Sequence, residues 1–345
     1  RENGFILGDW IINYEGGFTR RGLIGEIITT LSEFFSINLI NITFVIVVSL
    51  YLLFIFLLLR LINRSKIDFL IILLIFSPAT LLFNVYDPLA VGRKEFLIFL
   101  FFIIYLNFRD RKYAQFYLPF GAMAVSLTHE LFFLLTPMFF INRFIRLNSY
   151  RYKDYKVEIF IFTISLVSFI SILLITNSDP ILTCNYIKNF GLSSDVCWAI
   201  NLTSGSKAVF SDFYKESYYI NYYSIFFLLI IMHIFIILKI NLNIGNLKSI
   251  SLILLSIISI LALFLIVNDW GRYMNSFAFI WMLILIFNSK ISHVASINFL
   301  KILLIILFSF SWYMPHCCPE RHFTNIKYKP GIFYIFERIN YRINN

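Results

Sequence analysis

Long apolar stretches separated by short polar segments dominate the chain. The stretches are about 15–25 residues long, which is the length that a helix needs to cross a hydrocarbon layer about 30 Å thick. A membrane barrel would instead show short segments in which apolar and polar residues alternate, and residues 40–61 and 250–267 lack that pattern. The sequence therefore predicts an all-α, polytopic transmembrane helical bundle of about ten spans, or eleven if a further span precedes Arg1.

The expected spans follow the apolar stretches. They are 38–62, 67–85, 95–108, 114–128, 131–146, 157–177, 219–240, 249–267, 274–289 and 296–313. The fourth and fifth spans are short and adjacent. They form either a hairpin that reverses at His129 and Glu130 or one long kinked helix, since Pro119 and Pro137 permit both.

The spans divide the chain into three parts. An outer segment, 1–37, precedes a transmembrane helical domain, 38–313, which includes an outer loop at 178–218, and an outer C-terminal tail follows at 314–345. Within the outer segment, apolar residues recur at helical spacing between residues 22 and 35, with Glu26 and Glu33 between them. This pattern predicts an amphipathic helix that lies on the outer membrane interface.

Composition and charge agree with a membrane protein and indicate its orientation. Hydrophobic residues make up 59% of the chain and charged residues 14%, against about 45–50% and about 25% in soluble domains. The net charge of +10 does not predict a nucleic-acid partner, because the basic residues punctuate the spans instead of forming a patch. The loops around 60–66, 109–112 and 143–156 are rich in Lys and Arg, so we expect them in the cytoplasm.

Four clusters of ionisable residues fall on the outer face in this orientation. We expect them to contain the functional residues, which are Asp9, Glu15, Arg20 and Arg21 in the first segment, Asp87, Arg93, Lys94 and Glu95 in the second, His129 and Glu130 in the third, and Asp269 and Arg272 in the fourth. Arginines at an interface favour anions, and a shielded His or carboxylate serves as an acid or base. The structural alternatives are arginines that contact lipid phosphates, and a His–Glu pair satisfied by a carbonyl group and an arginine.

Cysteine spacing leaves one question open. Cys184 and Cys197 lie thirteen residues apart in the outer loop, where an oxidising compartment permits either a disulfide or two free thiols. The tail residues His316, Cys317, Cys318 and His322 lack the paired spacing of a metal site. We therefore expect no metal-binding residues and no cofactor, although a divalent metal ion in the reaction remains open.

The layout of the outer charges resembles that of bacterial O-antigen and capsule polymerases and of the C-type glycosyltransferase superfamily. The resemblance rests on Asp9 and Glu15, on Arg20-Arg21-Gly22 before an interfacial helix, on Arg93-Lys94-Glu95, and on Asp269 with Arg272. It implies glycosyl transfer from a polyprenyl-linked saccharide at the periplasmic face of the bacterial inner membrane, with membrane lipid and other polysaccharide-assembly proteins as partners. It also implies that Asp9 is the catalytic base and that the arginines contact the lipid diphosphate. Glu130 and His129 are further candidates for the base, because ionisable residues in an apolar span need partners or a wet cavity.

Two other functions remain compatible with the sequence. A polysaccharide transporter or flippase also uses charges within the membrane, but near its midplane and on broken helices. A membrane acyltransferase would use His129, although it leaves the arginines of three outer segments without a role.

Overall fold

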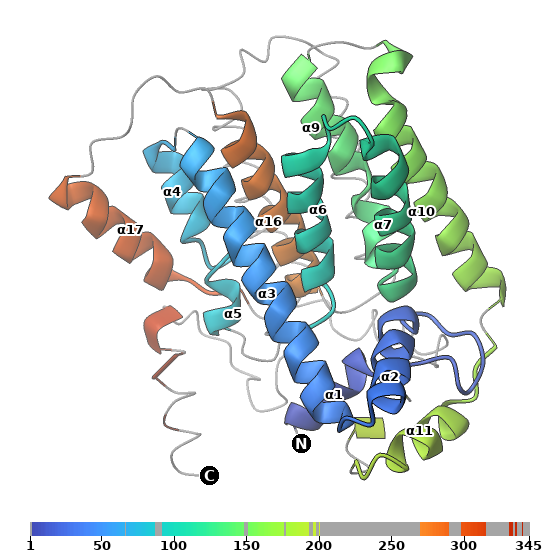
Figure 1. Cartoon of the computed structure of the whole chain (residues 1–345). Coiled ribbons are helices and arrows are strands. Elements are labelled where there is room, and N and C mark those ends of the chain that lie inside the picture. The colour runs from blue at the N-terminus through green and yellow to red at the C-terminus, as the bar shows by residue number, and fades with distance from the viewer. Residues whose placement is uncertain are drawn as a thin grey trace, which may run out of the picture. The chain divides into compact units, whose positions relative to one another are not determined.

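A computed structural model describes residues 2–65, 67–86, 92–147, 151–175, 177–192, 196–197, 200, 270–289, 298–314, 331–333, 335–336 and 340 (Figure 1). All regular secondary structure within these ranges is helical, as the sequence predicts. The chain divides into two compact units, Arg1–Arg60 with Gly92–Ala208 and Leu61–Val91 with Val209–Asn345. The expected spans 219–240 and 249–267 lie outside the described residues, as does almost all of the tail.

The first unit contains most of the described helices. They are α1 (Glu2–Trp10), α2 (Leu23–Phe35), most of α3 (Leu39–Arg64), α6 (Phe96–Phe108), α7 (Ala114–Thr128), α8 (Leu131–Leu135), α9 (Pro137–Leu147), the 3-10 turn η2 (Tyr152–Tyr155), α10 (Lys156–Ile175) and α11 (Pro180–Lys188). Ten of the thirteen residues of α6 are buried, and α7 packs against both α6 and α10. Since α6 is apolar on all sides, it forms the centre of this unit.

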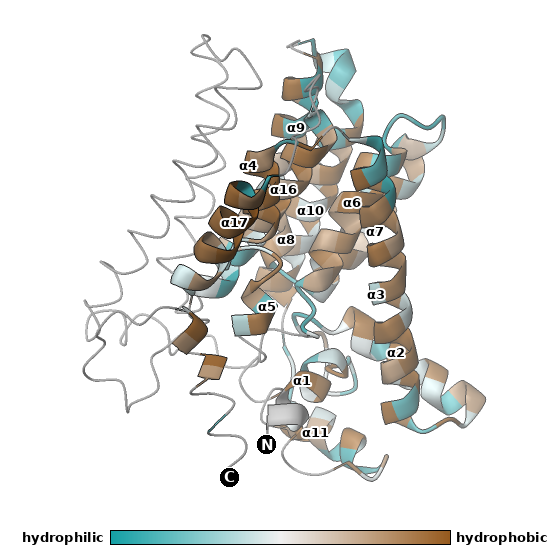
Figure 2. Cartoon of the chain, turned by 90° about the vertical axis from the view of Figure 1, so that its left-hand side faces the viewer, coloured by the Kyte–Doolittle hydropathy of each residue, from teal (hydrophilic) through white to brown (hydrophobic). Residues whose placement is uncertain are grey.

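Two helices among the described residues are long and apolar enough to cross a membrane. They are α3, with 26 residues, and the continuous segment Tyr152–Ile175, with 24 residues. Only 28% of the most apolar window of each helix is buried, whereas the core helix of a soluble protein buries most of its length. Figure 2 shows apolar residues along these helices and hydrophilic residues concentrated in the connecting segments.

The chain reverses between α7 and α8, which confirms the hairpin and excludes the single kinked helix. His129 adopts an extended backbone conformation that ends α7. Asp110, just before α7, pairs with Arg143 at 3.2 Å and with Arg146 at 2.5 Å, and both arginines lie in α9. The start of α7 and the end of α9 therefore lie at one end of the unit, and His129 with Glu130 lies at the other.

The helix expected between residues 22 and 35 is present as α2. Its buried residues include Gly25 and Ile28, whereas Phe34 and Phe35 at its C-terminal end are exposed. Gly25 is required for its packing, because a Cβ at this position would lie 1.9 Å from the carbonyl oxygen of Ile12. The sequence thus predicts the helix correctly, and its place on the membrane interface stays a prediction.

The second unit differs from the sequence prediction at one span. The stretch 67–85 does not form a continuous helix, but two short ones, α4 (Phe69–Ile75) and α5 (Phe83–Tyr86), which lie with α16 (Trp270–Asn288) and α17 (Phe299–Ser311) in this unit. The interruption leaves carbonyl groups without helical partners. Asn275 donates to two of them, at Ala79 (3.0 Å) and Thr80 (3.1 Å), and Ser309 donates to the carbonyl of Phe76 (2.8 Å). Long-range hydrogen bonds of this kind do not show in hydrophobic periodicity.

Candidate functional site

One end of the first unit gathers charged residues from four separate segments. We call this group the Arg21 cluster, and its members are Asp9, Arg20, Arg21, Lys94, Glu95, His129 and Glu130. Asp9 lies in the last turn of α1, and the two arginines precede α2. Lys94 and Glu95 precede α6, whereas His129 and Glu130 separate α7 from α8. All seven residues come from the first three of the four charged clusters that the sequence predicts on the outer face.

Arg21 and Glu130 form the central pair of the cluster. The Nε of Arg21 donates to Oε2 of Glu130 at 3.0 Å, and its Nη2 donates to Oε1 at 2.7 Å. The third nitrogen of Arg21, Nη1, lies 3.9 Å from the Asp9 carboxylate. Arg20 approaches Glu130 from the side, at 3.5 Å, and its side chain is more exposed than that of Arg21, 33% against 13%. Bidentate pairing of this kind fixes both position and orientation.

Lys94 joins the cluster through the main chain of Arg21. Its Nζ donates a 2.6 Å hydrogen bond to the carbonyl oxygen of Arg21, and the residue is completely buried. The segment that carries it is anchored at Gly92, whose carbonyl oxygen accepts a hydrogen bond from the indole of Trp10. The amide of Gly92 donates to the hydroxyl of Tyr51 at 3.1 Å. Helices α1 and α3 therefore hold the Lys94 segment in place.

His129 is buried, with protein groups beside both ring nitrogens. Its Nδ1 accepts a 3.2 Å hydrogen bond from the amide of Leu131. Nε2 lies 3.3 Å from Oε1 of Glu95, and the ring as a whole is 1% exposed. The imidazole is thus fixed between a main-chain donor and a carboxylate, in the arrangement of a positioned structural histidine.

Charge and burial shift the ionisation of the cluster in opposing directions. Burial raises the pKa of Glu130, but the positive charge of Arg21 outweighs it and holds this pKa well below the usual value. Burial likewise lowers the pKa of Arg21, and the Glu130 carboxylate more than compensates, so Arg21 stays charged. For Lys94 burial dominates over the attraction of Asp9 and lowers the pKa to about 8. Glu130 is therefore a firmly ionised partner of Arg21, which makes it a weak proton acceptor.

The segment that leads to Arg20 and Arg21 packs against the first turn of α11 and against the residues just before this helix. The Gly16 amide donates to Oγ1 of Thr183 at 3.2 Å, and the Gly16 carbonyl oxygen accepts from the Asp179 amide at 2.7 Å. Gly17 has a φ of 108°, and a Cβ there would lie 2.3 Å from the carbonyl oxygen of Asn177. The two glycines therefore allow close approach of another part of the chain.

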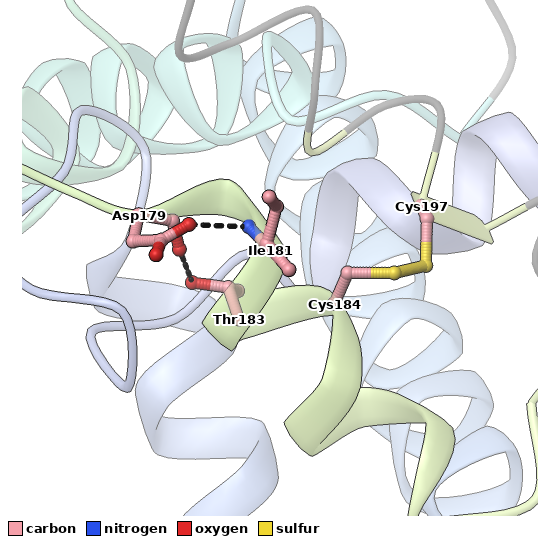
Figure 3. The surroundings of a disulfide bond; sticks show 5 residues. All are labelled: Asp179, Ile181, Thr183, Cys184 and Cys197. Carbon is pink, nitrogen blue, oxygen red and sulfur yellow. Dashed lines mark hydrogen bonds between the residues drawn. A yellow bond between two sulfur atoms is a disulfide. The ribbon is translucent and has the colours of Figure 1, made fainter.

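A disulfide closes this same region. Cys184 in α11 is bonded to Cys197 (Figure 3), which answers the question that the sequence left open. Asp179 caps the start of α11 by accepting a hydrogen bond from the amide of Ile181 at 2.8 Å, and its carbonyl oxygen accepts from the Thr183 hydroxyl. Asp179, which caps the start of α11, and Thr183 within this helix both contact Gly16.

A second charged network lies at the other end of α6. Glu158 is completely buried and accepts hydrogen bonds from Tyr105 (2.7 Å) and from Nε of Arg109 (2.9 Å). Arg109 and Arg143 also donate to the carbonyl oxygen of Asp154, each at 3.0 Å. This network ties α6, α9 and α10 together. From Glu95 to Arg109 the helix rises about 21 Å at about 1.5 Å per residue, which separates the network from the Arg21 cluster.

The other predicted site residues lie elsewhere or outside the described residues. Glu15 is exposed, and its charge acts on Tyr186 of α11, so it lies on the α11 side of its segment. Arg93 is half-buried and its charge acts on Glu95. Arg272 is buried in the first turn of α16, in the second unit. Asp87 and Asp269 lie outside the described residues.

Asp9 is paired less closely than Glu130 within the cluster. Its carboxylate is 7% exposed and approaches Arg21 only at 3.9 Å, so its oxygens are less committed than those of Glu130. Sequence reasoning selected Asp9 by its position, but it missed Asn177, Asp179 and Thr183, which support the arginine segment. The Gly16–Gly17 pair was the available signal, since two adjacent glycines mark a close approach of something to the backbone.

Within the described part of the chain, no group of three or more His, Cys, Asp or Glu side chains has the arrangement of a metal site. No protein-family model, curated protein or solved structure matches this chain.

Proposed function

We propose that this protein is a polytopic membrane glycosyltransferase of about ten spans that uses a polyprenyl-linked saccharide as donor at the periplasmic face of the bacterial inner membrane. The observation that carries the proposal is the Arg21 cluster, in which a weakly engaged carboxylate, Asp9, lies beside arginines at one end of an apolar helical unit. Glycosyl transfer from a diphosphate needs a base for the acceptor hydroxyl and cations for the leaving group. The cluster contains both.

The membrane placement is supported by two features of the first unit. Helices α3 and α10 have the length and apolar exposure of spanning helices. The disulfide between Cys184 and Cys197 supports an oxidising compartment on the side of the Arg21 cluster, since α11 contacts the segment that leads to Arg20 and Arg21.

In the proposed reaction, the acceptor hydroxyl attacks the anomeric carbon of the donor saccharide. The bond between this carbon and the diphosphate oxygen breaks, Asp9 takes the hydroxyl proton, and the polyprenyl diphosphate leaves with the bonding electrons. Arg20 is the better candidate for a phosphate contact because its side chain is the more exposed of the pair. Arg21 is held by Glu130, so we assign it to positioning and to the local positive potential. Arg93, which is half-buried, is a second candidate for the diphosphate.

The geometry of His129 weakens the acyltransferase alternative. A general base must reach the proton that it removes, whereas both nitrogens of His129 face protein groups and the residue is 1% exposed.

The transporter alternative retains one supporting observation. The chain breaks between α7 and α8 at two ionisable residues, His129 and Glu130, and broken helices with charges at the break are typical of transporter sites.

Reconstitution separates these two functions. The purified protein is placed in liposomes with a polyprenyl-diphosphate-linked saccharide in both leaflets, and the saccharide products are analysed by mass spectrometry, in parallel with a measurement of how fast the donor crosses the bilayer. A longer saccharide with release of polyprenyl diphosphate supports glycosyl transfer. Movement of the donor without any new glycosidic bond would replace the proposal by a flippase.

A further inference from the structure

Lys94 differs from the other cations of the Arg21 cluster in its burial. It is completely buried, whereas the side chains of Arg20 and Arg21 remain 33% and 13% exposed. Its Nζ donates to the carbonyl oxygen of Arg21 at 2.6 Å, so its head group contacts the main chain of its neighbour. A lysine in this position does not reach a ligand, which departs from the substrate-binding role that the sequence suggests for it.

The residue that Lys94 contacts has an unusual backbone. Arg21 has a φ of 66°, in the left-handed region, and only one other non-glycine residue of the described chain, Ser36, shares this feature. Ser36 ends helix α2, where left-handed residues are common. Arg21 precedes α2, and an arginine side chain does not by itself favour a left-handed conformation. Such a conformation persists in a bulky residue only where surrounding contacts enforce it, and it is found preferentially at functional sites.

We infer that Lys94 is a positioning residue that holds Arg21 in its left-handed conformation and thereby aims the guanidinium at Glu130 and Asp9. Three contacts fix Arg21, namely its carbonyl oxygen on Lys94, its Nε and Nη2 on Glu130, and its Nη1 near Asp9. The contact through the carbonyl oxygen acts on the backbone, and the other two act on the side chain. The functional role of this arrangement rests on the proposed function, whereas the three contacts do not depend on it.

The charge of Lys94 fits the same role. Asp9, Glu95 and Glu130 all act on it, and Arg21 is the cation that opposes it. A buried ammonium among three carboxylates stabilises their ionised forms while leaving Arg20 at the exposed edge. Because the Lys94 segment is anchored by Trp10 and Tyr51 through Gly92, the position of Arg21 depends on the packing of α1 and α3.

The first experiment compares alanine and glycine at position 21. Both substitutions remove the guanidinium, but only glycine adopts a left-handed turn without strain. With Lys94 present, we expect Arg21→Gly to melt higher than Arg21→Ala, by about 1–3 °C. In the Lys94→Met background the turn can relax, so the advantage of glycine should vanish or reverse. A glycine advantage that persists in the Lys94→Met background overturns the inference.

The second experiment reads the position of the Arg21 side chain directly. The full-length protein in detergent is treated with phenylglyoxal, which modifies arginine, and the extents of modification at Arg20 and Arg21 are compared within the same peptide. Lys94→Met should raise the ratio of Arg21 to Arg20 modification about tenfold, because the left-handed turn is released. Lys112→Met, which removes an exposed lysine, should leave the ratio unchanged.

An unchanged ratio in a folded Lys94→Met protein contradicts the positioning role. If Lys94→Met does not give monodisperse protein, Lys94→Gln replaces it in both experiments, since its shorter side chain keeps polarity but loses the charge and the reach to Arg21. Neither experiment measures glycosyl transfer. A negative result here therefore leaves the proposed function standing, and failure of the transfer assay leaves the role of Lys94 standing.

Discussion

Arg21 and Glu130 are 109 positions apart in the sequence, and Arg21 donates to the Glu130 carboxylate from Nε to Oε2 at 3.0 Å and from Nη2 to Oε1 at 2.7 Å. This pair connects the segment before α2 to the break between α7 and α8. It also indicates that Glu130 stabilises the fold, because its carboxylate neutralises a largely buried arginine.

Glu130→Gln should destabilise the protein by about 2–4 kcal/mol, because it leaves the Arg21 guanidinium without its charged partner in a largely desolvated site. Thermal unfolding in detergent, followed by intrinsic fluorescence, measures the effect. Arg151→Ala is the control, since its pair with Asp154 involves a side chain that is 83% exposed and such pairs contribute at most about 1 kcal/mol. Equal decreases in melting temperature in the two variants would show that the Arg21–Glu130 pair stabilises the protein no more than the exposed pair does.

Asp9→Asn should lower glycosyl transfer about 10²–10⁴-fold, the usual contribution of a general base, while the protein still folds. The reconstituted assay with a polyprenyl-linked donor measures transfer, and thermal unfolding tests the fold. Glu33→Gln serves as the control, because Glu33 lies on α2 and pairs with the Tyr186 hydroxyl at 2.6 Å, away from the Arg21 cluster. Full transfer by a folded Asp9→Asn protein would remove Asp9 from the mechanism.

Stability should rise with pH between about 8 and 10.5 through Lys94. The folded pKa of Lys94 is lowered from 10.5 to about 8 by burial, so the unfolded chain binds more protons than the folded protein in this window. Deprotonation then favours the folded state, and the slope should disappear in Lys94→Met. Melting temperatures measured across this pH range in both proteins test it, and the same slope in both would mean that another group is responsible.

Acid should lower stability through Glu130. Its folded pKa lies well below the usual value of 4.5 because the charge of Arg21 outweighs its burial. The stability that it contributes is present above about pH 4.5 and is lost as the pH falls toward its folded pKa. Melting temperatures from pH 6 down to pH 3 should therefore fall less steeply in Glu130→Gln than in the unmodified protein. A steeper fall in the variant would contradict this sign.

Removal of the disulfide by the double substitution Cys184→Ser and Cys197→Ser should cost about 3 kcal/mol, the loop-closure value for a loop of roughly this length. The two cysteines lie 13 positions apart in the sequence, and Cys184 is in α11, whose Thr183 contacts Gly16. The matched control is Cys317→Ser with Cys318→Ser in the tail. A gain of two hydrogens in mass when the unmodified protein is reduced would confirm the bond chemically. Equal melting temperatures of all three proteins would show that the bond contributes no stability.

The proposed orientation predicts that Glu15→Cys, in a protein otherwise free of cysteine, reacts with a membrane-impermeant thiol reagent in intact cells. Lys112→Cys should react only after the membrane is opened. Both positions are exposed, so a difference between them reports the side of the membrane. The reverse pattern would place the Arg21 cluster in the cytoplasm and contradict glycosyl transfer at the periplasmic face.

The sequence by itself determined most of the helices. Hydrophobic periodicity is a local property, so α2, α3, α6, α7 and α10 follow within a few residues from the pattern of apolar positions. The pattern failed at 67–85, where a run apolar enough for one span is interrupted between α4 and α5. The interruption is stabilised by Asn275 and Ser309, which lie about 200 residues away in the sequence, and no local pattern carries that information.

Tertiary structure alone decided how the charged residues are used. The sequence identified Asp9, Arg21 and Glu130 as candidates because ionisable residues are costly beside apolar helices and need a reason to be there. It could not assign Glu130 to Arg21, because an ion pair depends on distance in space and on the reversal of the chain at His129. Nor could it find the left-handed backbone of Arg21, since that conformation is imposed by contacts such as the one from Lys94 and not by the residue that adopts it.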